Sequence, residues 1–347
     1  MEESNIRLPD PRRLIVSSSP HLHHPDQIRR IMLTVIAALL PACLVGVYVF
    51  GWRALWVLGL SSLSCLAVEF FCCRLRGVES TIGDGSALLT GILVGMCLPA
   101  SAPWWLCLLG GLLAIGLGKQ IYGGLAYNPF NPALVARVGL AISFPSLMAG
   151  AAWVRPQPGR FTAAVQAVTT PTPLDHWKTN AVAGTDYLDY FLGNMPGCIG
   201  ETSAAALLLG GLVLLVLGYI RWQVPVGFIG TVTLFALVSW LLAPGQYPPP
   251  QFHVLTGGLM LGAWFMATDM VTSPITRQGA LIFGVGCGLI TAVIRLWGGY
   301  PEGVAFSILF MNALTPLIDR YSLRKPFGAE GQPLHKDSGP DSGLLSK

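Results

Sequence analysis

Long apolar runs limit what this chain can fold into more than any other feature. Segments such as 31–50 and 225–243 contain no charged side chain over about 20 residues, which is the length an α-helix needs to cross the hydrocarbon core of a bilayer. Only 11% of the residues are charged and 53% are hydrophobic, whereas a soluble domain carries about 25% charged residues. The sequence therefore predicts an all-α integral membrane protein in contact with the lipid bilayer, and excludes a soluble enzyme.

Charge and cysteine content argue against a nucleic-acid-binding protein and against a metal site built by this chain alone. The net charge of +4 is modest, and it gives no sign of a nucleic-acid partner. Most of the eight cysteines lie within apolar runs and no CxxC spacing occurs. We therefore expect the cysteines to act as small hydrophobic side chains, and we expect no metal site built by this chain alone.

About ten candidate spans follow from the apolar runs. They cover 31–50, 54–73, 84–99, 103–122, 130–149, 202–220, 225–243, 253–270, 279–297 and 303–319. The arginines at span ends share one face if the count is ten: Arg29, Arg30, Arg74, Arg76, Arg221, Arg277 and Arg320. The positive-inside rule makes that face cytoplasmic, so both termini are predicted inside and the long loop 150–201 outside.

An internal repeat lies within this pattern. The segment 89–95 (LTGILVG) resembles 255–262 (LTGGLMLG) with one residue inserted, and 131–137 loosely resembles 312–320. Because each half would hold five spans, an odd number, the halves would be inverted, as in many transporters. The short third and eighth spans are then expected to break near mid-membrane; alternatively, Gly-rich helices resemble each other by composition alone. The predicted divisions are a cytoplasmic segment 1–30, a five-helix repeat 31–149, the outer loop 150–201, a second repeat 202–321 and a cytoplasmic tail 322–347.

Ionisable side chains in or near spans are candidates for function because they are costly in a bilayer. They are Glu69, Asp84, Lys119, Arg137, Asp269 and Arg295. Near a helix end such a charge can instead reach the headgroups or cap the helix. Arg137 lies deeper, so it is expected to be paired, either with an anionic ligand such as a phosphate or reduced flavin, or with neighbouring carbonyls.

Two short boxes are candidates for ligand binding. Asn128 and Asn131 belong to the run NPFNP, which is either an N-capped helix start or an unwound segment facing a ligand. The second box, Gly200-Glu201-Thr202-Ser203, enters an apolar helix. Thr202 or Ser203 is a fair N-cap, Glu201 suits the positive end of the helix dipole, and free amides there would suit a phosphate. Plain capping explains the second box equally well.

The outer loop holds the threonine-rich run TTPTP at 169–173. By itself this run is typical of a proline-rich turn with exposed hydroxyls. A threonine hydroxyl is a poor nucleophile unless a neighbour activates it, and no adjacent His–Asp arrangement is evident in the sequence. If one of these threonines carries a covalent group, another enzyme is expected to attach it.

Taken together, these segments resemble the RnfD/NqrB family, the membrane subunits of the Rnf electron-transport complex and of the sodium-pumping quinone reductase. The resemblance rests on SSSPH at 17–21, GDGSALLTG at 83–91, the NPFNP box, the 197–203 box and the Thr-rich loop. It extends to about residue 326 and implies a multi-pass flavoprotein of the bacterial inner membrane, with loop 150–201 periplasmic.

The resemblance also implies a cofactor. Family members carry FMN joined through its phosphate to the last residue of an Asp-x-x-Ser/Thr-Gly-Ala-Thr pattern, which falls here on Thr172. Gln166 stands in place of Asp, and Thr170 and Pro171 in place of Gly and Ala, so Thr169 and Thr170 stay open as alternative acceptors. A separate flavin transferase would attach FMN from FAD. A second flavin, non-covalent riboflavin, would lie near the third, fifth and eighth spans.

The function expected from the resemblance is electron transfer within an ion-translocating oxidoreductase. The chain would not act alone, because sister subunits supply iron–sulfur clusters and further flavin, and sodium or protons would be the transported ion. Two rivals from other classes stay open: a redox-inactive channel or transporter for a small solute, and a scaffold subunit. Flavin content separates all three.

Overall fold

The computed structural model describes residues 28–148, 153–154, 156, 158–159, 170–180, 186–300 and 302–322. Among these residues the regular secondary structure is helical, and isolated bridge residues include the pair Pro99 and Cys198. The predicted all-α class is confirmed. Thr169, Gln166 and both terminal segments lie outside the described residues, so the predictions made for them are not tested.

The first half begins with two long helices. Helices α1 (Ile28–Phe50) and α2 (Trp52–Arg76) are joined only by Gly51. They are followed by α3 (Ser86–Cys97), α4 (Trp104–Gly111), which continues as the π-helix η3 (Leu112–Gln120), then α5 (Pro132–Ser143) and α6 (Pro145–Met148). A short 3-10 turn, η2 (Ile82–Asp84), precedes α3.

The second half repeats this order with a different third member. It comprises α9 (Ala204–Val216), α10 (Gln223–Leu242), the broken segment α11 (Pro250–Leu255), α12 (Leu259–Leu261) and π-helix η6 (Gly262–Met266), then α13 (Arg277–Trp297) and α14 (Val304–Ser322). Between the halves lie α7 (Pro173–Asn180), α8 (Tyr187–Leu192) and the 3-10 turn η5 (Ile199–Glu201).

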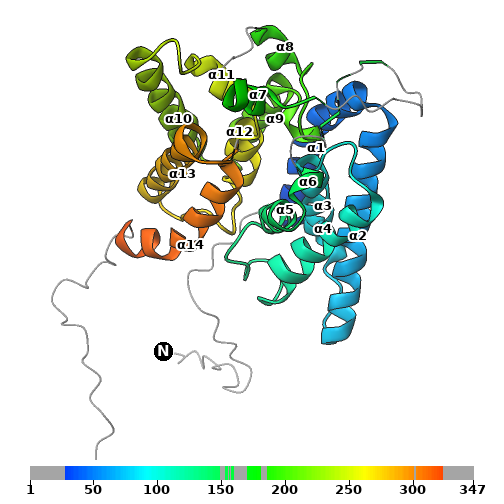
Figure 1. Ribbon diagram of the computed structural model, residues 1–347. Helices are drawn as coiled ribbons and strands as arrows, with labels where there is room; N and C mark the ends of the chain where they lie inside the picture. Colours follow the sequence, from blue (N-terminus) through cyan, green and yellow to red (C-terminus); the bar gives the residue numbers. More distant parts are fainter. Residues whose placement is uncertain are drawn as a thin grey trace, which may run out of the picture.

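Helix pairing recurs in the two halves. In each half the second long helix packs on the third and fourth segments, and the fourth packs on the fifth, while α1 meets α9 and α5 meets α14 between the halves. Figure 1 shows α1–α5 on one side of the bundle and α10, α13 and α14 on the other. This arrangement agrees with the predicted repeat, whereas its inverted orientation and the division boundaries stay predictions.

Close helix contacts explain two glycines of these apolar runs. A Cβ atom on Gly91 of α3 would lie 2.5 Å from Ser62 Cα of α2, and one on Gly284 of α13 would lie 2.6 Å from Val224 O of α10. Small residues let membrane helices approach to backbone contact. The α2–α3 pair and the α10–α13 pair therefore each include a close approach at a glycine.

The structure corrects several predicted spans. Four helices, α1, α2, α10 and α13, are long and apolar enough to cross a membrane, and the other apolar helices among the described residues are shorter; the count of ten stays a prediction. The fifth predicted span does not run on to 149, because α5 ends at Ser143 and α6 starts at Pro145. Only one of the two predicted mid-span breaks occurs: α3 is short but continuous, whereas 253–270 is interrupted at 256–258.

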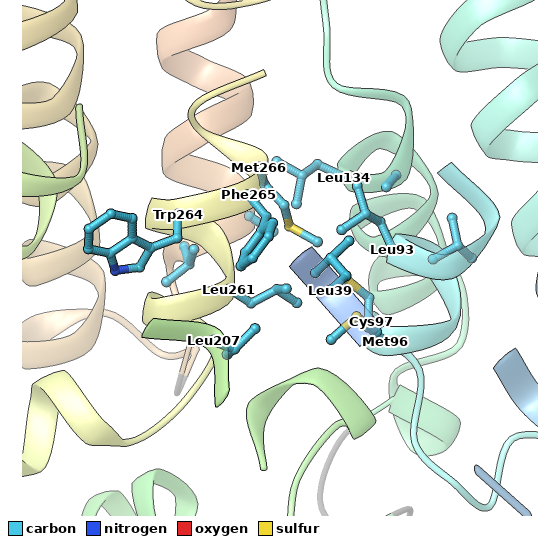
Figure 2. Close-up of a cluster of buried hydrophobic side chains, with 14 of the residues drawn as sticks. Leu39, Leu93, Met96, Cys97, Leu134, Leu207, Leu261, Trp264, Phe265 and Met266 are labelled. Atoms are coloured by element: carbon cyan, nitrogen blue, oxygen red, sulfur yellow. The ribbon is translucent and has the colours of Figure 1, made fainter. Parts of the chain in front are cut away.

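One inserted residue accounts for that difference. Gly257, one of the two adjacent glycines where the extra residue falls, has φ +71°, a conformation that glycine adopts freely and an α-helix cannot contain. The break leaves the end of α11 and the start of α12 pointing into the bundle. Around it, apolar side chains from α1, α3, α5, α9, α12 and η6 form the shared core shown in Figure 2.

Loops at the same end of the ten predicted spans contact each other in the structure. Trp177 Nε1 of α7 donates to Gln246 O, and Lys178 of α7 donates to Gly298 O and Tyr300 O. At the other end of the bundle, Arg221 donates to the carbonyls of Pro274 and Ile275. The two sets of loops therefore lie at opposite ends, and the assignment of one end to the cytoplasm stays a prediction.

Candidate functional site

Arg137 of α5 lies at the centre of a buried charge cluster. Its guanidinium donates to Glu201 Oε1 at 3.3 Å, to Cys198 Sγ at 2.9 Å, and to Glu302 and the carbonyl of Cys97. The side chains of Glu201 and Glu302 are 4% and 20% exposed. The prediction that Arg137 is paired is therefore confirmed, and the partners are two carboxylates, a carbonyl and a cysteine sulfur of this chain.

The break at Thr256–Gly258 completes this cluster. Gly258 N donates to Glu302 Oε1 at 3.3 Å. Arg295 of α13 donates to His253 O at 2.6 Å and to Thr256 O at 3.2 Å, at the end of α11. Because helix ends leave backbone groups unpaired, these side chains satisfy the two ends that the break creates inside the bundle.

Thr172 is the N-cap of α7. Its Oγ1 accepts from Asp175 N at 3.1 Å and donates to Asp175 Oδ2 at 2.9 Å. The side chain is 8% exposed. No activating neighbour was evident from the sequence, yet the structure places a carboxylate against this hydroxyl.

Two side chains of α7 fix it to the second half. Trp177 packs edge-on against His253 and Phe252 of α11, with ring centroids 5.4 and 6.4 Å away. Lys178 Nζ donates to Gly298 O at 2.6 Å and Ile294 O at 3.2 Å, at the end of α13. A cation at a helix C-terminus pairs with its free carbonyls and its dipole, so Lys178 holds α7 in place.

A small cavity joins Thr172 to the Arg137 cluster. Its volume is about 80 Å³, and its lining includes Thr172, Asp175, Arg137 and Glu302 together with the aromatic side chains of Trp153, Tyr300 and Phe306. We call it the Thr172 pocket. It brings together Thr172, Arg137 of α5 and Glu302 of the α13–α14 connection, which are far apart in the sequence.

The pKa of Asp175 is raised above its ordinary value of 3.8, chiefly because the carboxyl is partly buried and also because Glu302 is near. A group whose pKa is higher in the docked state stabilises docking fully below its ordinary pKa, and that contribution is lost as pH rises through the raised pKa. Asp175→Asn should therefore strengthen docking of α7 by a few-fold at neutral pH and remove its pH dependence above 3.8. Hydrogen exchange of the α7 amides between about pH 4 and 7 measures this.

Asp189→Asn is the matched control, because Asp189 is exposed on α8 of the same loop region. It should leave the protection of α7 and its pH profile unchanged. Equal profiles for the wild type and Asp175→Asn would contradict the role given to burial.

The residues of the 200–203 box make contacts within the chain. Ser203 caps α9 by accepting from Ala206 N at 3.2 Å, and Thr202 Oγ1 donates to Ile199 O at 2.9 Å. Gly200 is enclosed, since a Cβ there would lie 2.8 Å from Met96 Cβ. Glu201 faces Arg137, and the role expected for it at the start of α9 stays a prediction. An anion site at this helix start stays a prediction.

The NPFNP box contains an N-capped helix start, while its role in facing a ligand stays a prediction. Asn131 caps α5 by accepting from Ala133 N at 3.0 Å, and its amide donates to Met266 O of π-helix η6 at 3.2 Å. Asn128 Oδ1 is buried without a hydrogen-bond partner. Both residues line a second cavity, of about 50 Å³, with Ser86, Lys119, Phe265 and Asp269; we call it the Asn pocket.

A buried ion pair stands beside the Asn pocket. Lys119 Nζ lies 2.8 Å from Glu69 Oε1 and donates to Ser86 Oγ at 2.8 Å, and both charged side chains are at most 2% exposed. Thr81 also donates to Glu69. Lys119 lies in the last turn of η3, as Arg295 lies in the last turn of α13, so each half buries one cation at the end of its fourth segment.

Two of the candidate acceptors differ in their surroundings. Among the described residues, Thr170 Oγ1 is buried without a hydrogen-bond partner, whereas Thr172 Oγ1 has Asp175. Sequence reasoning missed Asp175 and Glu302. The Thr-x-x-Asp spacing of a helix start was a signal for the first, and a lone acid in the short Gly-rich connection 298–303 for the second.

Comparison with known proteins agrees with the resemblance seen in the sequence. Residues 15–328 match the model of the NQR2, RnfD, RnfE family. The chain is 44% identical over 320 residues to one component of the Na(+)-translocating ferredoxin:NAD(+) oxidoreductase complex of Acetobacterium woodii, covering 91% of this chain and 95% of that protein.

Two other relatives carry related names. A component of the proton-translocating ferredoxin:NAD(+) oxidoreductase complex of Clostridium ljungdahlii is 43% identical, covering 90% of this chain and 96% of that protein. A component of the ion-translocating oxidoreductase complex of Stutzerimonas stutzeri is 44% identical, covering 89% and 95%. On both the family match and these identities, the chain belongs to the NQR2, RnfD, RnfE family.

Proposed function

We propose that this chain is the electron-carrying membrane subunit of an ion-translocating oxidoreductase complex and that Thr172 carries FMN as a phosphoester. The complex is inferred from the names of the relatives, which are components of ion-translocating oxidoreductase complexes. The single structural observation that supports the cofactor is the hydrogen bond from Thr172 Oγ1 to Asp175 Oδ2 at the wall of the Thr172 pocket. The relatives' names include both sodium and protons, so the transported ion is one of these two.

The residues around Thr172 favour attachment of FMN but leave little space for its ring. The hydroxyl is held by a carboxylate that can accept its proton, which is what an oxygen nucleophile needs. The cavity has a volume of about 80 Å³, which suits a phosphoester better than a three-ring flavin. The flavin ring would therefore lie outside the cavity, toward the loop face of the bundle.

Bound FMN would supply the redox chemistry, and the chain would supply position. Asp175 orients the Thr172 oxygen, and Trp177 and Lys178 hold α7 against α11 and α13. The Arg137–Glu302 pair closes the inner wall of the pocket with fixed charges. Covalent attachment keeps the cofactor from being lost on a face without a pool of free flavin.

A second flavin, riboflavin, is proposed for the Asn pocket. This pocket lies between α3, α5 and η6, and it offers the unpaired Asn128 Oδ1, the Asn131 amide and the Lys119 ammonium as polar partners. Its volume of about 50 Å³ requires the neighbouring side chains to part before a flavin can enter. The short α3 and π-helix η6, which line the pocket, are the elements that would move.

The proposal includes surroundings and partners. The chain would reside in the bacterial inner membrane with both termini cytoplasmic and loop 150–201 periplasmic. A separate flavin transferase would load Thr172, and sister subunits with iron–sulfur clusters and flavin would exchange electrons with it.

Thr172→Ala tests the covalent cofactor. After expression with a flavin transferase, the wild type should show flavin fluorescence in a denaturing gel and Thr172→Ala none, because the acceptor oxygen is missing. Thr172→Ser keeps the hydroxyl and the N-cap, so it should stay fluorescent, and so should Thr170→Ala. Mass spectrometry of the 161–178 peptide locates the adduct.

The outcomes separate the alternatives. An adduct on Thr169 or Thr170 would move the acceptor and leave the covalent flavin in place. A peptide without adduct on all its threonines would refute covalent FMN. Purified chain without any flavin absorbance would favour a redox-inactive transporter or a scaffold.

A further inference from the structure

The outer surface of the first half carries a groove far larger than the two pockets above. It lies between the end of α2 and π-helix η3, has a volume of about 680 Å³, and is walled by Leu75, Leu113, Leu117 and Ile121, with Arg76 and Gln120 at its rim. Leu75 is 86% exposed and Ile121 70% exposed. In a multi-pass membrane protein these side chains face lipid, so something apolar fills the groove.

The floor of the groove is open because of Gly116. A Cβ atom at this position would meet only Leu112 Cδ1 at 3.5 Å and Val68 Cγ1 at 4.0 Å, both ordinary contacts. The π-helical turns of η3 surround this glycine, and π-helical turns occur frequently at functional sites. The result is a slot with flexible aliphatic walls.

The rim of the groove lies at headgroup level. Helix α2 has 25 residues and ends with Arg74 and Arg76 in its last turn, and a helix of that length is about 37 Å long, longer than the hydrocarbon core of about 30 Å. Arg76 therefore reaches the polar boundary of the bilayer while the slot beside it extends among the acyl chains.

The guanidinium at the rim is held by a hydrogen bond and has no charged partner among the residues that the structure describes. Arg76 Nη1 donates to Gln120 Oε1 at 2.8 Å, and Gln120 is itself buried, at 6% exposed. Within the described part of the chain, no carboxylate forms an ion pair with Arg76. One donor of the guanidinium fixes its orientation, and the others are free to bind an anion.

We propose that this groove binds an anionic phospholipid, with its phosphate on Arg76 and an acyl chain along Leu113, Leu117 and Ile121. The groove combines an apolar slot with an oriented, unpaired cation at the membrane boundary, which is the chemistry of an anionic lipid. A transmembrane helix of a partner subunit fits less well, because such contacts favour small residues that allow close backbone approach, whereas these walls are large aliphatic side chains.

Native mass spectrometry of the full-length chain in detergent tests the site. Phosphatidylglycerol and phosphatidylcholine with identical acyl chains are titrated separately, and the ratio of their dissociation constants is measured. The wild type should prefer phosphatidylglycerol, and Arg76→Gln should lower that preference about fivefold, the effect of one cation near the headgroups. Arg53→Gln is the matched control, since Arg53 is an exposed arginine at the opposite end of the same helix, and it should keep the preference.

A second variant separates the slot from the charge. Gly116→Leu fills the floor of the groove and should weaken binding of both lipids equally. A wild type without preference for phosphatidylglycerol, or an Arg76→Gln variant with unchanged preference, would overturn the proposal. So would capture of another subunit by a crosslinker on Cys72, in the groove wall, together with lipid binding that is indifferent to Gly116→Leu.

Discussion

Lys119→Met should lower the free energy of unfolding by about 3–5 kcal/mol, the usual result of removing one partner from a buried ion pair. Glu69 is 0% exposed, and one of its oxygens, Oε2, already lacks a hydrogen-bond partner. Without the ammonium, the remaining carboxylate would keep only the hydrogen bond from Thr81. Unfolding of the detergent-solubilised chain, followed by tryptophan fluorescence, measures the loss.

The double variant Glu69→Leu/Lys119→Met is the control for this prediction. Replacing both members of a buried pair by apolar side chains is often neutral or stabilising, so the double variant should recover most of the loss. A double variant as unstable as Lys119→Met alone would show that Lys119 acts through packing or through Ser86 instead of through Glu69.

Arg137→Met should lower the free energy of unfolding by about 3 kcal/mol, because it leaves two carboxylates in the bundle without their shared cation. The expected loss lies at the lower end of the usual range, since Glu302 is 20% exposed and can keep water as a partner. The variant should also loosen α7, whose Thr172 and Asp175 share a pocket with Arg137. Unfolding and hydrogen exchange of α7 measure the two effects.

Glu302→Gln removes one negative charge from the cluster and keeps a side chain of the same shape. It therefore separates the loss of a charge from the loss of a contact. The guanidinium keeps Glu201 at 3.3 Å in this variant, and the amide can still accept from Gly258 N. It should therefore be clearly less destabilising than Arg137→Met. Equal losses in the two variants would contradict the view that Arg137 serves both carboxylates.

Most helices could be predicted because their signal is local. Apolar runs mark α1, α2, α10 and α13 to within a few residues, since a chain in a bilayer must satisfy its own backbone groups over a fixed length. The break at 256–258 was harder to predict from the sequence. The same LTG pattern occurs in α3 without a break; at 255–262 one extra residue follows the pattern, and Gly257 has a positive φ.

The charged residues of the site could be predicted from the sequence, but the partner of each one could not. The cost of burying a charge marked Glu69, Lys119, Arg137 and Arg295 as candidates. Their partners come from other elements, such as Glu302 for Arg137 across 165 positions. A sequence without aligned relatives contains no signal for such contacts.

The sequence by itself determined the membrane class, the long helices, the grouping of loops at two ends and the family resemblance, because hydrophobic length and short motifs are local properties of a chain. Only the tertiary structure decided that Thr172 meets Asp175 above the Arg137–Glu302 pair, and that Lys119 is matched with Glu69. These contacts depend on how helices from distant parts of the chain pack, since a buried charge can take any partner that the fold brings within reach.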